Sequence, residues 1–165
     1  MKLAKAVKFD EVTLSIGVVL FINKIPRLLI GELVKIPRPT PPIVMIEAIG
    51  REEENPSDPT YLAKVQQWET EVSMKMVDAF VLFGTALKSK PDGFSDFLDN
   101  SISAKLKILG ITANSSDERY LAWVKFIACA EDDDITLIVD SVGRLSGVSE
   151  KDVSDAVSKF RGNSE

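Results

Sequence analysis

Histidine is absent from this chain of 165 residues, and cysteine occurs only once. Without histidine the chain cannot form a His-based catalytic triad, an HExxH zinc site or an imidazole switch near neutral pH. The single cysteine, Cys129, excludes an internal disulfide, a Cys-x-x-Cys redox pair and a cysteine cluster for zinc or iron–sulfur binding. Because Cys129 lies in an apolar stretch, we interpret it as a packing residue and not as a nucleophile.

Long hydrophobic runs are also missing. The longest, residues 16–22, has seven residues, whereas a membrane-spanning helix needs about 20. The basic beginning of the sequence, residues 1–8, is interrupted by Asp10 and Glu11 before an apolar signal region develops. We therefore expect a soluble intracellular protein with no signal peptide and no membrane partner.

The charges are unevenly distributed. Residues 1–46 hold seven Lys and Arg against three Asp and Glu, a net charge of +4, so residues 47–165 carry -9 of the total of -5. The cations of the first segment are scattered singly and lack interleaved aromatic residues, unlike a nucleic-acid-binding patch. We expect no nucleic-acid partner.

Sequence motifs for catalysis and cofactor binding are absent as well. The chain has no GxGxxG, Walker A, GxSxG or EF-hand pattern. Residues 132–134 are three aspartates, which we interpret as a helix N-terminus because adjacent helical residues point in different directions. Residues 52–54 are three glutamates, interpreted as part of a solvated loop. We predict a non-enzymatic protein with no catalytic, cofactor-binding or metal site.

The N-terminal part shows β periodicity. Apolar residues alternate between positions 12 and 22, which predicts a hairpin with arms at residues 7–14 and 18–23, or one strand with a glycine bulge. Apolar residues at helical spacing then predict a short helix from Pro26 to the boundary at Pro37.

A proline tract follows, with Pro37, Pro39, Pro41 and Pro42 among six residues. Proline fixes φ and removes an amide donor, so this segment favours an extended conformation. It is either a stiff connector or a docking strip for a partner. Residues 43–48 read as a short strand, and residues 50–59 as a polar loop.

The strongest pattern is an apolar stripe at helical spacing. Ser57 or Asp58 can cap the helix and Pro59 suits its first turn, so we predict a helix over residues 59–87, about 40 Å long. The stripe serves either the core or a partner. Its residues are Tyr61, Val65, Trp68, Val72, Met76, Phe80, Phe83 and Leu87.

The remainder predicts a set of short helices. One group spans Phe94 to Leu109 and ends near Gly110, and a Ser-x-x-Glu capping box at residues 115–118 begins the next helix. A helix after residues 132–134 ends at Gly147, and residues 149–152 resemble the cap of a last helix.

Together these patterns predict a predominantly α-helical α+β fold. Its parts are an N-terminal β-hairpin with a short helix (residues 1–36), a Pro-rich connector with a short strand and an acidic loop (37–56), and a helical body with one long helix (57–165). We predict protein contacts at Pro37, Pro39, Pro41, Pro42, Trp68, Val72, Met76, Phe80 and Phe83.

Four segments carry a resemblance to a known family. They are PRPTPPIVMIE at residues 37–47, GREEENPSDPTYL at 50–62, RYLAW at 119–123 and RLSGVS at 144–149. The chain resembles, from about residue 25 to 161, small proteins encoded among the tail genes of long-tailed bacteriophages, and is similar in role to tail assembly chaperones.

This resemblance implies a morphogenesis factor that acts in the host cytoplasm. Such a protein would bind the long helical tape-measure protein, keep it soluble and help to recruit tail-tube subunits. The alternatives are a structural virion protein of the neck, tail completion or baseplate, located in the virion tail, and a small enzyme with clustered carboxylates. Self-association into a homo-oligomer is open.

Overall fold

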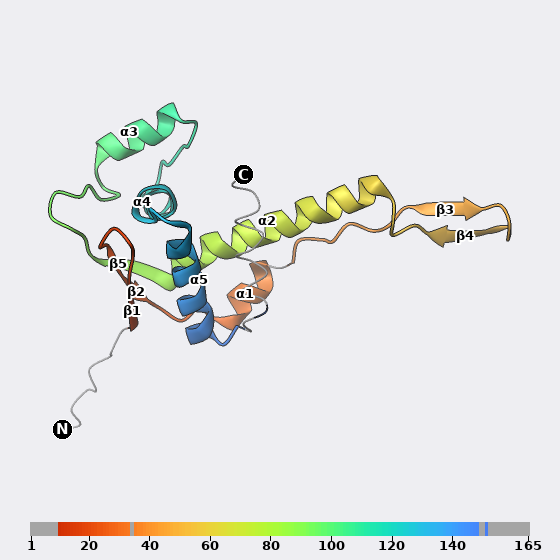
Figure 1. The fold of residues 1–165 in the computed structure, drawn as a ribbon, viewed down its shortest axis with the longest axis horizontal. Coiled ribbons are helices and arrows are strands. Elements are labelled where there is room, and N and C mark those ends of the chain that lie inside the picture. Colours follow the sequence, from red (N-terminus) through yellow and green to blue (C-terminus); the bar gives the residue numbers. More distant parts are fainter. Residues whose placement is uncertain (1–9, 34, 149–150, 152–165) are drawn as a thin grey trace, which may run out of the picture.

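The computed structural model describes residues 10–33, 35–148 and 151 (Figure 1). In chain order the elements are β1 (Asp10–Thr13), β2 (Val19–Ile22), α1 (Arg27–Leu33), β3 (Ile43–Ile46), β4 (Arg51–Glu54), α2 (Pro59–Gly84), β5 (Thr85–Ser89), α3 (Asn100–Ile108), α4 (Ser116–Trp123), the π-helical turn η1 (Val124–Ala128) and α5 (Asp132–Ser146). The predicted α+β class, with helices predominating, is confirmed.

The first hairpin forms where the alternating pattern predicts it. β1 and β2 pair antiparallel, and the turn between them contains Gly17 at φ 90°, a conformation that suits glycine. β2 also pairs with β5, so the sheet order is β1-β2-β5. The N-terminal hairpin is thus built into a sheet with a strand that lies far along the sequence.

The long helix begins as predicted and ends earlier. Asp58 caps α2 by accepting a hydrogen bond from the Tyr61 amide at 2.9 Å, and Pro59 occupies the first turn. The helix stops at Gly84, whereas the sequence predicted Leu87. Leu87 instead lies opposite Leu20 in the sheet, because β5 supplies backbone partners for β2.

The core lies between this sheet, the C-terminal half of α2, α4, η1 and α5. Trp123 and Phe80 are its largest wholly buried side chains. On the α2 side, Lys125 of η1 donates to Asp78 at 2.6 Å. The buried apolar residues of the first hairpin that join this core are Val12, Leu14, Val18, Leu20 and Ile22.

The caps of the C-terminal helices agree with the sequence. Ser115 and Glu118 form the predicted capping box of α4, and α5 begins at the three aspartates and ends at Gly147 with φ 72°. Of the short helices predicted between Phe94 and Leu109, the structure contains α3, which begins at Asn100. Phe94 precedes it and packs edge-on against Trp123, which holds this segment to the core without a helix. The last predicted helix lies outside the described residues.

One predicted loop is a strand. Arg51–Glu54 form β4, which pairs antiparallel with β3, so the three glutamates lie in a strand and not in the predicted loop. Glu52 and Glu54 are exposed, as predicted, and Glu53 is partly buried. A four-residue turn joins the strands and contains Gly50 at φ 62°. Backbone pairing with the apolar strand β3 stabilises an extended conformation that the charged residues alone do not favour.

Candidate functional site

The most distinctive surface is an arm that projects from the body of the molecule. We define the arm as residues 35–72, which comprise the proline tract, the β3–β4 hairpin and the N-terminal half of α2. In Figure 1 the hairpin extends beyond the N-terminal end of α2, away from the helical body. Throughout this fully described range no residue is buried. The arm therefore adds no buried side chain to the core.

The first residues of the proline tract are held against α2 by Trp68. The Trp68 indole nitrogen donates a hydrogen bond to the Ile36 carbonyl at 2.8 Å, and the Arg38 guanidinium lies 5.7 Å from the centre of the Trp68 ring. This cation–π geometry covers part of the ring. Trp68 is partly buried, and its indole ring contacts Ile36 and Arg38 of the same chain. Its principal contacts are therefore intramolecular.

The four prolines differ in exposure. Pro37 is exposed, and Pro39, Pro41 and Pro42 are partly buried. They lie in the segment 35–42 that precedes β3 and forms neither helix nor strand. At the end of the tract the Pro42 carbonyl accepts a hydrogen bond from the Asn55 amide at 2.8 Å, which extends the hairpin pairing by one residue pair.

The hairpin has one apolar strand and one charged strand. Ile43, Val44, Met45 and Ile46 lie opposite Glu54, Glu53, Glu52 and Arg51 respectively. Ile43 is 66% exposed and Met45 58% exposed. Exposed apolar side chains that adjoin a row of carboxylates on a projecting element are typical of a protein interface.

The apolar stripe of α2 does not form a continuous exposed face. Met76 and Phe80 are core residues, so their prediction as partner contacts is wrong for this fold. Val72 is partly buried. Phe83 is 55% exposed, but it lies at the opposite end of α2 from the arm. The stripe changes role along the helix because all the buried residues of α2 lie in its C-terminal half, from Ser73 to Gly84.

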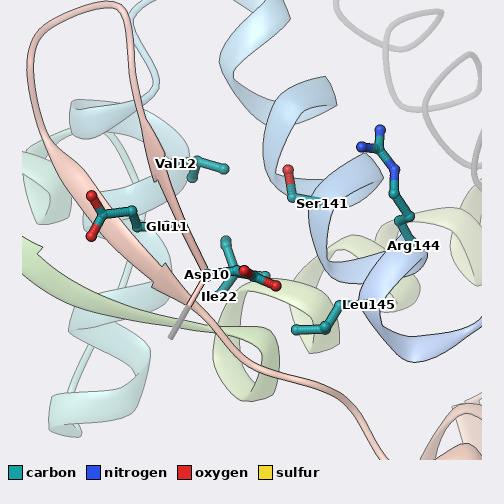
Figure 2. Close-up of a pocket in the computed structure, with 7 residues that line it drawn as sticks. All are labelled: Asp10, Glu11, Val12, Ile22, Ser141, Arg144 and Leu145. Atoms are coloured by element: carbon teal, nitrogen blue, oxygen red, sulfur yellow. The ribbon is translucent and has the colours of Figure 1, made fainter. Parts of the chain in front are cut away.

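A second candidate is the cleft between the first hairpin and α5 (Figure 2). Its volume is about 430 Å³, and its lining residues are Asp10, Glu11, Val12, Ile22, Ser141, Arg144 and Leu145. The Glu11 carboxylate pairs with Lys88, and the Ser141 hydroxyl donates to the Leu137 carbonyl at 2.6 Å. These contacts do not assemble a nucleophile with a base, so the arm is the stronger candidate.

Two side chains near the core, Cys129 and Tyr120, have raised pKa values. Burial raises the pKa of the Cys129 thiol to about 12, and the nearby Asp134 charge adds to the rise. Burial likewise raises the pKa of Tyr120 to about 12, although its hydroxyl shares a hydrogen bond of 2.7 Å with the Thr85 hydroxyl. Cys129 is therefore protonated at neutral pH, which agrees with its interpretation as a packing residue.

Within the part of the chain that the structure describes, no three Cys, Asp or Glu side chains lie close enough together to hold a metal ion. None of the helices described combines the length and apolar character needed to cross a membrane. No protein-family model, curated protein or solved structure matches this chain.

The sequence did not predict the hairpin of the arm. Its signal was a four-residue segment containing Gly50 between an apolar and a charged run, a spacing typical of hairpins. The charged run obscured it, because glutamate is depleted in strands.

Proposed function

We propose that this protein is a non-enzymatic assembly factor that binds another protein through its arm. One observation carries the proposal: residues 35–72 contain no buried side chain, yet they display exposed apolar residues. These apolar side chains stay in contact with water in the folded chain, so they contribute little to the free energy of folding. A partner that covers them removes apolar surface from water, which favours association.

The resemblance to phage tail-gene products gives the proposal its specific form. The partner is the tape-measure protein, whose long helices need their apolar faces covered before the tail tube assembles around them. The N-terminal half of α2 offers a helical surface for such a contact, and Leu62 is exposed there. In this role the protein acts in the host cytoplasm and leaves before the virion is complete.

Co-expression with the tape-measure protein of the same phage genome, followed by pull-down, tests the contact. Leu62→Glu, and separately replacement of the four prolines by Gly and Ser, are expected to reduce recovery of the tape-measure protein at least tenfold. Leu28→Glu is the matched control, since Leu28 is an exposed leucine on α1 outside the arm. Unchanged recovery with both arm variants contradicts the proposal.

Mass spectrometry of purified virions separates this role from a structural one. A chaperone is absent from the mature particle, whereas a neck, tail-completion or baseplate protein is present at a fixed copy number. Detection at a fixed copy number therefore replaces the chaperone role by the structural role.

A further inference from the structure

The β3–β4 hairpin is an incomplete sheet. Among the residues that the structure describes it has two strands, and these lie outside the core. An isolated two-stranded hairpin is at best marginally stable in water, and a third strand or a covering surface normally completes it.

In the described part of the chain no strand pairs with the outer edge of β3, where some of its backbone hydrogen-bonding groups lie. The hydrogen bond from Asn55 to Pro42 makes these two residues a hydrogen-bonded pair of the antiparallel ladder. Because such pairs alternate with non-hydrogen-bonded pairs, Val44 directs its amide and carbonyl toward β4. Ile43 and Met45 therefore direct theirs away from β4, toward the open edge.

The side chains distinguish the two edges. β3 is wholly apolar, with the sequence IVMI, and β4 is wholly charged, with the sequence REEE. Charged residues on an edge strand oppose the addition of a further strand, whereas an uncharged strand rich in β-branched residues accepts one. The β3 edge is thus the open edge for pairing.

We propose that β3 pairs antiparallel with β3 of a second copy of this chain, which gives a four-stranded sheet of order β4-β3-β3-β4. Antiparallel pairing of identical strands is self-complementary and generates a two-fold axis. With the axis at Val44, the outward backbone groups of Ile43 meet those of Met45 in the second copy, and the two Val44 residues face each other.

The charge distribution favours this arrangement over pairing through β4. In the proposed sheet the two glutamate strands lie three strand spacings apart, about 14 Å, which exceeds the Debye length of about 8 Å at physiological ionic strength. Pairing through β4 would place them one spacing apart, about 4.8 Å, with little screening. The same charges then form both outer edges and stop the assembly at two copies.

Proline substitutions on the two edges test the proposal in the full-length chain. Met45→Pro removes an amide that faces the open edge and leaves the β3–β4 hydrogen bonds in place, since proline is tolerated on such an edge. Glu52→Pro is the matched control, because Glu52 lies opposite Met45 and its amide faces the other edge. Light scattering of the purified parent chain and of Glu52→Pro is expected to give about twice the chain mass of 18.2 kDa at high concentration. For Met45→Pro we expect 18.2 kDa at the same concentration.

Disulfide trapping provides a second measurement that does not require an altered strand. In a Cys129→Ala background, Val44→Cys places two thiols across a non-hydrogen-bonded pair, where Cα atoms lie about 4.5 Å apart and a disulfide can form. Glu53→Cys on β4 is the control, since Glu53 is the strand partner of Val44. We expect a covalent dimer for Val44→Cys and little for Glu53→Cys.

A mass of 18.2 kDa for the parent chain at every concentration, or preferential trapping through Glu53→Cys, overturns the proposal. Both measurements use the purified chain alone and do not depend on the proposed function. A chain that is monomeric and still binds the tape-measure protein would refute only the dimer, and a dimer that does not bind it would refute only the assembly role.

Discussion

Ser15 and Asp134 lie 119 positions apart in the sequence and are joined by two hydrogen bonds. The Ser15 amide donates to Asp134 Oδ1 at 2.7 Å, and the Ser15 hydroxyl donates to Oδ2 at 2.6 Å. The Glu131 amide also donates to this carboxylate, at 3.1 Å. One side chain thus caps α5 and fixes the turn of the first hairpin.

This carboxylate predicts a loss of stability in acid. Burial opposes ionisation of Asp134, but the hydrogen bonds from Ser15, Glu131 and Ala130 outweigh it and lower its pKa. A folded-state pKa below the unfolded value of about 3.9 stabilises the fold above that value, and the contribution disappears as the pH falls through the folded pKa. We expect Asp134→Asn to lower the free energy of unfolding by about 1–3 kcal/mol at pH 7 and by less near pH 3.

Urea unfolding of the parent chain and the variant at both pH values checks this prediction. Asp132→Asn is the control, because it removes the same charge in the first turn of the same helix, at an exposed position. A difference between parent and Asp134→Asn that is equal at both pH values would contradict the assigned role.

Alanine substitution of the two phenylalanines near the end of α2 should reduce stability to very different extents. Phe80 is wholly buried in the core, whereas Phe83 is 55% exposed. Phe80→Ala leaves a cavity and is expected to cost about 3–5 kcal/mol, while Phe83→Ala is expected to cost less than about 1 kcal/mol. Denaturant unfolding measures both, and comparable losses would show that the burial pattern of α2 is wrong.

Alanine substitution of two helical glycines should change the free energy of unfolding in opposite directions. A Cβ at Gly84 would meet Val142 Cγ1 at 2.5 Å, whereas a Cβ at Gly31 in α1 has no neighbour within 4 Å. Gly84→Ala overpacks the contact between α2 and α5 and should cost about 1–3 kcal/mol. Gly31→Ala should raise the free energy of unfolding by about 0.5–1 kcal/mol, because alanine loses less backbone entropy in a helix. Thermal unfolding distinguishes the two, and stabilisation by Gly84→Ala would refute the close approach.

Substitution of Trp68 should have a local effect on the arm, whereas substitution of Trp123 should lower the stability of the whole fold. Trp68→Phe removes the hydrogen bond to Ile36 and should speed amide exchange at the non-proline residues of the segment 35–42, which are Lys35, Ile36, Arg38 and Thr40. Global stability should change by less than about 1 kcal/mol. Trp123→Phe leaves the Ser95 carbonyl without its indole donor at 2.9 Å and a gap in the core, and should cost about 1–3 kcal/mol. Hydrogen exchange with mass spectrometry measures both effects. A loss of global stability in Trp68→Phe would contradict the conclusion that the arm lies outside the core.

The arm was only partly predictable from the sequence. The proline tract is predictable as a candidate contact because proline fixes its own backbone conformation. The pairing of Glu52 with Met45 is not predictable in the same way, since it depends on a partner strand and not on the residue's own preference. The split of the α2 stripe into a core half and an arm half depends on which elements cover the helix, and helical spacing alone carries no such information.

The residue types predict the local signals: a helix cap at Ser57 or Asp58, which the structure places at Asp58, the capping box of Ser115 with Glu118, and the end of α5 at Gly147. Each of these depends on atoms within a few residues of one another, so the residue types suffice to predict it. Three other outcomes depend on contacts between distant segments: α2 ends at Gly84, Leu87 joins the sheet, and Asp134 binds Ser15. These outcomes arise from strand pairing and burial between distant segments, whose energies exceed the local preferences that a sequence displays.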